Sequence, residues 1–292
     1  MSKNRKNPVK QTNQFPRGPK LSTARPVPLS RRQGQTSQGA TSPQGLLVEG
    51  ASVVLEYIRF SPKSIREIWV EPQAFGPHQL ILKALGEIEN SIPVHRMSRE
   101  EVLAHWGVTS LQGNVAAMTK KNVLSEDEGL SALIKNHNER DLILVLDHIQ
   151  DPRNLGAIIR SAAFFNVRYV FFPERRQAPL TSVVASTAQG GLAFTQLTRV
   201  TNLSRLIREL KKQGFWIIGA DMAGQVVGSS IRRLDKIALV LGSEGEGLSH
   251  QIKQHCDVLV GVPSLSGLES LNVSVAAGIL LSQLATNEPR QT

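Results

Sequence analysis

The stretch DLILVLDHIQDPRNLGAIIRSAAFF, residues 141–165, decides the fold class of this 292-residue chain. Its first part, LILVLD, is an unbroken apolar run, which is typical of a strand in a sheet covered on both faces. Pro152 ends that strand, and Asn154 is well placed to cap the helix that follows. A buried strand joined to a helix by a short polar loop indicates an α/β fold.

The same alternation continues to residue 281. Together, these segments predict a mostly parallel sheet with flanking helices. Further strands are expected at residues 167–172, 194–200, 215–221, 236–242 and 257–262. Further helices are expected at residues 181–188, 203–213, 248–255 and 273–281.

Residues 46–120 predict a separate small α/β unit. It combines helical periodicity, short alternating strands and a capping box formed by Ser98 and Glu101. The polar residues 121–139 are expected to connect the two domains, with a helical turn around Leu130–Ile134.

Positive charge is concentrated at the N-terminal end of the chain. The net charge is +10, and residues 1–45 hold nine of the 34 Lys and Arg residues but no acid. This tail is rich in Pro, Gln, Ser and Gly, so it cannot bury enough surface to fold alone. A disordered basic arm suits a polyanion, most simply RNA. A solubilising tail or an organelle-targeting segment remains open, although prolines disfavour an amphipathic targeting helix.

Composition excludes several classes of protein. The single cysteine, Cys256, rules out a disulfide framework and a cysteine-based zinc site, and it fits a reducing cytoplasm. No apolar run is long enough to span a membrane. His250 and His255 lack the spacing of a known metal motif, so we predict no metal site.

Polar residues follow three of the expected strands, at residues 147–160, 242–249 and 262–272. Ligands of parallel sheets bind beyond the carboxyl ends of the strands, so these loops predict a binding site. The loop GSEGEGLS lacks both the phosphate-loop and the G-x-G-x-x-G spacing.

Structural explanations compete with functional ones at these loops. The glycines suit a tight turn, but a turn does not require Glu244. Arg160 could form a surface ion pair. Ser270 can cap the last helix, whereas capping alone does not explain Asn272.

Taken together, the three segments resemble the signature motifs of the SpoU (TrmH-like) branch of the SPOUT RNA methyltransferases. The resemblance spans about residues 46–290. It implies a trefoil-knotted methyltransferase domain at 140–290 and an L30e-like substrate-binding domain at 46–120. The subgroup it resembles most methylates a guanosine 2′-hydroxyl in 23S ribosomal RNA. The implied cofactor is S-adenosylmethionine without a metal, and the implied assembly is a cytoplasmic homodimer that binds RNA and no membrane.

The resemblance also implies roles for individual residues. The catalytic positions are Asn154, Arg160, Glu244, Ser270 and Asn272. The cofactor-binding positions are Gly242, Gly245, Val262, Ser270 and Leu271. Because a guanidinium is effectively always protonated, we expect Arg160 to hold an acceptor phosphate and stabilise the oxyanion rather than act as a base.

Two departures from the family pattern concern the substrate. The small domain has the sequence Leu111-Gln112-Gly113 where the family often has His-Gln-Gly. Residues 183–194 lack a lysine that family members often have in this segment. The alternatives are therefore the same chemistry on transfer RNA or on a resistance site of ribosomal RNA, and a non-catalytic ribosomal-RNA-binding assembly factor. The separate small domain favours ribosomal RNA, and the presence of the motif residues favours an enzyme.

Overall fold

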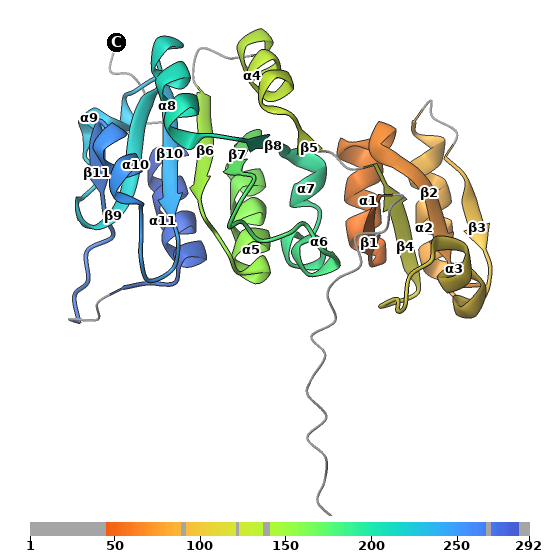
Figure 1. The fold of residues 1–292 in the computed structure, drawn as a ribbon. Coiled ribbons are helices and arrows are strands. Elements are labelled where there is room, and N and C mark those ends of the chain that lie inside the picture. The colour runs from red at the N-terminus through yellow and green to blue at the C-terminus, as the bar shows by residue number, and fades with distance from the viewer. Residues whose placement is uncertain (1–44, 89–91, 121–122, 137–140, 267–269, 286–292) are drawn as a thin grey trace, which may run out of the picture. The chain divides into compact units, whose positions relative to one another are not determined.

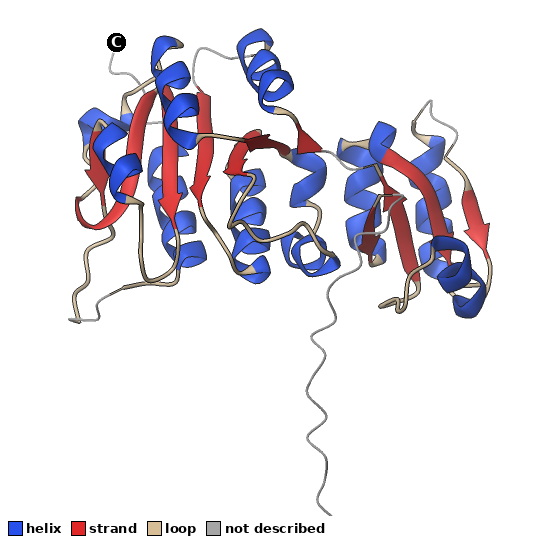
Figure 2. Cartoon of the chain, viewed as in Figure 1, coloured by secondary structure: helices blue, strands red, loops and turns tan. Residues whose placement is uncertain are grey.

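The computed structural model describes residues 45–285 except 89–91, 121–122, 137–140 and 267–269. The predicted basic tail therefore lies, but for Gly45, outside the described residues. Within them the chain forms two sheets, one of four strands and one of seven (Figures 1 and 2). No helix in the described part of the chain is long and apolar enough to cross a membrane.

The larger sheet is parallel between every pair of neighbouring strands, which confirms the predicted mostly parallel sheet. Its strands are, in spatial order, β11 (Val258–Val260), β9 (Trp216–Gln225), β10 (Lys236–Gly242), β6 (Asp141–Asp147), β7 (Tyr169–Pro173), β8 (Gln196–Val200) and β5 (Val123–Leu124).

Helices cover both faces of this sheet, as the apolar strand β6 predicts. Leu144 and Leu146 belong to the core on one face, while Ile143 and Val145 belong to the core on the other. Burial on both faces explains why β6 is apolar at successive positions. The first face carries α5 (Pro152–Phe164), α6 (Ser182–Ala188), α7 (Gly191–Phe194), α9 (Ser229–Arg232) and α11 (Val273–Ala285). The second carries α4 (Glu126–Lys135), α8 (Leu203–Lys212) and α10 (His250–His255).

The chain order reverses between β6 and β10. From β6 the chain continues to β7 and β8 on one side, whereas β10, β9 and β11 lie on the other. Strands β6 and β10 are neighbours in the sheet (Figure 1), and their ends are in register, with Asp147 opposite Gly242. The loops that follow these two strands therefore begin side by side, at the kind of switch point where α/β sheets bind ligands.

The smaller sheet is mixed. Its strands are, in spatial order, β1 (Leu46–Glu49), β4 (Val115–Thr119), β2 (Ile65–Val70) and β3 (Val94–Arg96), and only β2 and β3 run parallel. The helical elements of this part are α1 (Ala51–Phe60), the 3₁₀ turn η1 (Pro62–Ser64), α2 (Phe75–Gly86) and α3 (Arg99–Trp106).

The two faces of strand β2 pack into different hydrophobic clusters. Ile68 and Val70 pack with α1 and α2, while Trp69 packs on the opposite face with Trp106 of α3. The predicted capping box of α3 is present: Ser98 Oγ accepts from the Glu101 backbone, and the Glu101 carboxylate accepts from the Ser98 backbone.

The predicted connection contains more structure than expected. Residues 123–124 form β5 at the edge of the large sheet, and α4 spans ten residues rather than a single turn. A capping box formed by Ser125 and Glu128 begins this helix, and that signal is legible in the sequence. Residues 121–122 and 137–139 lie outside the described part.

Candidate functional site

The end of β6 is anchored by a buried carboxylate. Asp147 is 1% exposed, and its Oδ2 accepts a hydrogen bond from the backbone N–H of Ser249 at 2.8 Å. Its Oδ1 lies 2.6 Å from Nδ1 of His148. Asp147 therefore ties the loop after β6 to the loop after β10. Sequence reasoning missed this role, although an acid that ends a buried strand is a signal that could have found it.

Helix α5 begins with Asp151 as its N-cap, so the prediction of Asn154 as the cap was wrong. Asp151 Oδ1 accepts from the backbone N–H of Arg153 at 2.6 Å and of Asn154 at 3.4 Å. Asn154 lies in the first turn and is 8% exposed. Because Asp151 satisfies the helix end, the Asn154 amide is available for contacts outside the helix.

The glycine loop after β10 is closed on itself. Ser243 and Gly247 exchange two backbone hydrogen bonds of 3.0 Å. A Cβ at Gly242 would lie 2.1 Å from the carbonyl carbon of Gly247, so only glycine allows this close approach. Gly245 has open space around it but a φ of +90°. The loop thus holds Glu244 at an exposed position beside α5.

Three side chains from the three predicted loops form a continuous hydrogen-bonded row. Asn154 Nδ2 donates to Glu244 Oε2 at 2.7 Å. Asn272 Nδ2 donates to Asn154 Oδ1 at 3.0 Å. The Asn154 amide is held at both ends, since it donates to a carboxylate and accepts from an amide. We call Asn154, Glu244 and Asn272 the polar row.

Asn272 also begins helix α11, so the expectation that Ser270 caps this helix was wrong. Asn272 Oδ1 accepts from the Ser274 backbone N–H at 2.9 Å and from the Ser274 hydroxyl at 2.6 Å. Ser270 lies two residues earlier and is exposed, and Glu269 lies outside the described residues.

A cavity of about 260 Å³ borders the polar row. Its volume is close to the lower limit of small-molecule sites, about 300 Å³. Six of its eight lining residues carry polar side chains, which can bind hydroxyl or amine groups of a ligand. The lining residues are Ile149, Gln150, Asp151, Asn154, Ser243, Glu244, Glu246 and Val273.

Comparison with known proteins identifies the family of the chain. The profile of the SpoU rRNA Methylase family matches residues 141–282. The 23S rRNA (guanosine-2′-O-)-methyltransferase RlmB of Xanthomonas campestris is 35% identical over 247 residues, which cover 82% of this chain and 96% of that protein. The chain belongs to the SpoU rRNA methylase family.

A second relative supports the SpoU assignment, and a solved structure shows the fold. The RlmB protein of Coxiella burnetii is 44% identical over 173 residues, which cover 59% of this chain and 69% of that protein. The SpoU methyltransferase AviRb of Streptomyces viridochromogenes, crystallised with AdoMet, has a TM-score of 0.65 at 18% identity over 82% of this chain and 88% of that one. At this low identity, AviRb shows that the fold is shared.

The positions that the family resemblance assigns to the cofactor do not line this cavity. Gly242 is buried at the end of β10, Val262 is half-buried just after β11, and Leu271 is 47% exposed just before α11. Gly245 is exposed in the glycine loop.

Arg160 stands apart from the polar row. It is exposed on α5, six residues after Asn154. Helix geometry places it about 9 Å farther along the axis and about 240° around it. The structure therefore brings together three of the five predicted catalytic residues, while Arg160 and Ser270 face solvent.

Proposed function

We propose that this chain is an S-adenosylmethionine-dependent RNA ribose 2′-O-methyltransferase that acts on a guanosine of 23S ribosomal RNA. The observation that carries the proposal is the polar row, because it joins the three loops of the SpoU-matched region at the switch point of the sheet. The names of the RlmB relatives support the choice of RNA and of nucleotide.

The proposed organisation follows the two sheets. Residues 140–290, together with β5 and α4, form the methyltransferase domain, and residues 46–120 form an L30e-like RNA-binding domain. Residues 1–45 form a basic arm that contacts RNA. A trefoil knot is supported by the path of the chain, which must travel from β11 at the sheet edge to Asn272 beside Asn154.

When bound, S-adenosylmethionine supplies a methyl group on a sulfonium, which is electrophilic without a metal. Backbone groups of Gly242, Val262 and Leu271 would hold the cofactor, and Gly245 and Ser270 are the further positions that would contribute to binding it. The Glu244 carboxylate and the Asn154 amide line the adjoining cavity and orient hydroxyl and amine groups there, while Asn272 holds the Asn154 amide in place. The polar side chains that line the cavity fit ribose hydroxyls.

Arg160 holds the phosphate of the acceptor nucleotide and stabilises the negative charge that develops on the 2′-oxygen. Its guanidinium stays protonated, so the proton of the hydroxyl passes to the phosphate or to another acceptor. Because Arg160 is exposed and distant from the row of its own chain, we propose a cytoplasmic homodimer in which Arg160 of the partner subunit completes each site.

Titration calorimetry with S-adenosylmethionine tests the enzyme assignment. One cofactor per chain is expected, with weaker binding after Leu271→Pro, which removes a backbone N–H at a cofactor position. Absence of binding by an intact dimer would instead support a non-catalytic ribosomal-RNA-binding factor. Methyl transfer to transfer RNA, rather than to ribosomal RNA, would support the proposed reaction but contradict the proposed substrate.

A further inference from the structure

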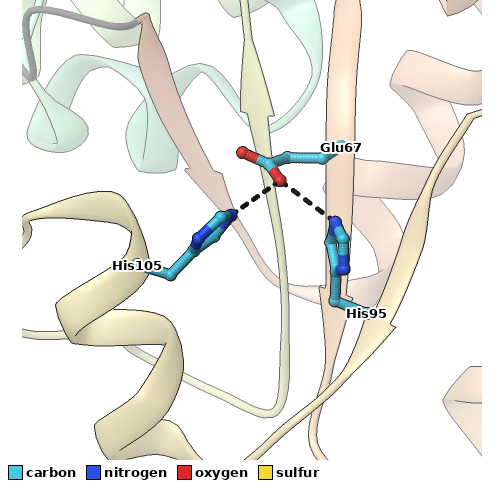
Figure 3. A group of neighbouring side chains, drawn as sticks. All are labelled: Glu67, His95 and His105. Atoms are coloured by element: carbon cyan, nitrogen blue, oxygen red, sulfur yellow. Dashed lines mark hydrogen bonds and ion pairs between the residues drawn. The ribbon is translucent and has the colours of Figure 1, made fainter.

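Two histidines and a glutamate converge on the α3 face of the small sheet (Figure 3). Glu67 belongs to β2, His95 to the neighbouring strand β3, and His105 to α3. Glu67 Oε2 lies 3.1 Å from Nε2 of His95 and 3.0 Å from Nε2 of His105. The sequence gives no sign of this cluster, because the three residues are separated by 28 and 10 positions and meet only through the fold.

The carboxylate of this cluster is held in place from behind. Trp106 is 2% exposed, and its indole N–H donates to the other oxygen, Glu67 Oε1, at 2.8 Å. The indole N–H of Trp69 ties the start of α3 to the sheet by donating to the carbonyl of Met97 at 2.8 Å. The orientation of Glu67 is therefore fixed, with Oε2 directed at the two imidazoles. Outer contacts of this kind are a regular feature of metal-binding carboxylates.

We propose that Glu67, His95 and His105 bind a divalent transition metal ion of the zinc class. Two imidazole nitrogens and one carboxylate oxygen are a known zinc ligand set, and imidazole favours zinc over magnesium or calcium. Bonds of zinc to such ligands are about 2.0–2.2 Å, so tetrahedral ligand atoms lie about 3.3–3.6 Å apart. The three ligand atoms already lie within 4.8 Å of one another. A small outward movement of the side chains admits the ion.

The fourth coordination position is open to solvent. The side chains of His95 and His105 are 33% and 48% exposed, so water can complete the coordination shell. The ion would join β2, β3 and α3, of which β3 has only three residues and α3 eight. Its role is to stabilise the small domain, because an ion that binds only the folded state favours folding.

The test uses untagged full-length protein stripped with a chelator, because a histidine tag would bind the same ions. Competition with a chromophoric chelator measures Zn²⁺ affinity and stoichiometry, and Co²⁺ reports coordination through its visible absorption. We expect one ion per chain. Affinity should fall by about tenfold or more after Glu67→Gln, His95→Gln or His105→Gln. His78→Gln, in α2 of the same domain, is the matched control and should bind as the unchanged protein does.

Glu67→Gln separates metal binding from folding. Glutamine keeps a carbonyl oxygen for the Trp106 indole but loses the charged partner of the two histidines. Without metal, the variant should therefore keep the far-UV circular dichroism of the unchanged protein and melt at most a few degrees lower. Zn²⁺ should raise the melting temperature of the unchanged chain and of His78→Gln by a few degrees, and leave Glu67→Gln unaffected. The proposal would be overturned if Zn²⁺ binding were unchanged in Glu67→Gln, His95→Gln and His105→Gln, or if the unchanged protein showed no saturable binding. The three residues would then form hydrogen bonds only.

Discussion

Asn272 uses both ends of its side-chain amide. Its oxygen accepts from the first turn of α11, and its nitrogen donates to Asn154. The sequence indicated a role for this residue beyond capping, but it assigned the cap itself to Ser270. Which of several neighbouring polar residues caps a helix depends on where the chain turns, and the local pattern does not determine that. The same reason explains why Asp151, rather than Asn154, caps α5.

Two substitutions separate the tasks of Asn272. Asn272→Ala removes both the helix cap and the hydrogen bond to Asn154. It should lower the free energy of unfolding by about 1 kcal/mol, the usual cost of a lost cap. Asn272→Asp keeps a capping oxygen but loses the N–H donor to Asn154. The aspartate variant should therefore lose less stability than the alanine variant, yet lose at least about tenfold in methyl transfer. Urea unfolding and a methyl-transfer assay measure the two effects. Full activity of the aspartate variant would show that the polar row has no role in the reaction.

Gly242 and Gly245 differ in why glycine is required. In Gly242→Ala the new Cβ would meet the backbone of Gly247 and Leu248 at 2.1–2.3 Å, so the loop must shift. We expect a loss of about 3 kcal/mol or more in unfolding free energy, at the upper end for overpacking. In Gly245→Ala the space is open, and only a φ of +90° opposes the change, at a cost of about 1 kcal/mol. Equal losses in urea unfolding would contradict this distinction.

At the scale of elements, long apolar or periodic segments were predictable and short ones were not. Strand β6 and helix α8 follow directly from their apolar patterns, and the structure has both. β1 and β5, of four and two residues, are too short to show a period. The sheet gives β5 its register through pairing with β8, a long-range contact that local sequence does not contain.

Helix α4 is held to the sheet by Glu126. Its carboxylate accepts from the Thr201 backbone at 3.2 Å and pairs with Arg205 at 2.9 Å. Burial alone would raise the pKa of Glu126, but the hydrogen bonds from Arg205 and Thr201 and the charge of Arg205 hold it below its ordinary value of 4.5. The ionised form therefore favours folding above pH 4.5, and this contribution is lost as the pH falls through the lower pKa of the folded state.

Glu126→Gln should accordingly destabilise the protein most at neutral pH. The partner Arg205 is exposed, so the expected loss at pH 7 is modest, up to about 1 kcal/mol. The difference from the unchanged chain should narrow as the pH falls below 4.5. Urea unfolding across this range measures it, with Glu100→Gln in α3 as a control for the loss of one surface carboxylate. A difference that does not depend on pH would contradict the role of the ionised carboxylate.

At the scale of the whole molecule, residue patterns led to a parallel sheet with a site at its carboxyl edge. The structure has the sheet and, at that edge, the polar row. Convergence of residues 154, 244 and 272 follows from the register of β6 and β10 together with the return of the chain to α11. Neither the return path nor the position of Arg160 relative to the row can be derived from periodicity, because both depend on connections across the sheet. The family resemblance supplied those expectations.

Mixing two inactive variants tests the proposed assembly. Arg160→Ala and Asn154→Ala should each inactivate the homodimer. If each site uses Asn154 from one chain and Arg160 of the partner subunit, a mixed dimer keeps one intact site. Unfolding and refolding the variants together should restore about a quarter of the normal rate of methyl transfer, since half of the dimers are mixed and each has one site. Sizing chromatography confirms dimers. A refolded dimeric mixture as inactive as its components would place Arg160 in the site of its own chain.

The proposed reaction is methyl transfer to the 2′-hydroxyl of a guanosine in 23S ribosomal RNA. The most direct measurement is nucleotide-resolution mapping of 2′-O-methyl groups on 23S RNA from cells that lack this protein, after incubation with the purified chain and S-adenosylmethionine. One guanosine should gain a 2′-O-methyl group with the unchanged chain, and the same position should stay unmodified with Asn154→Ala. A methyl group on a base, on another RNA, or on no RNA at all would contradict the account.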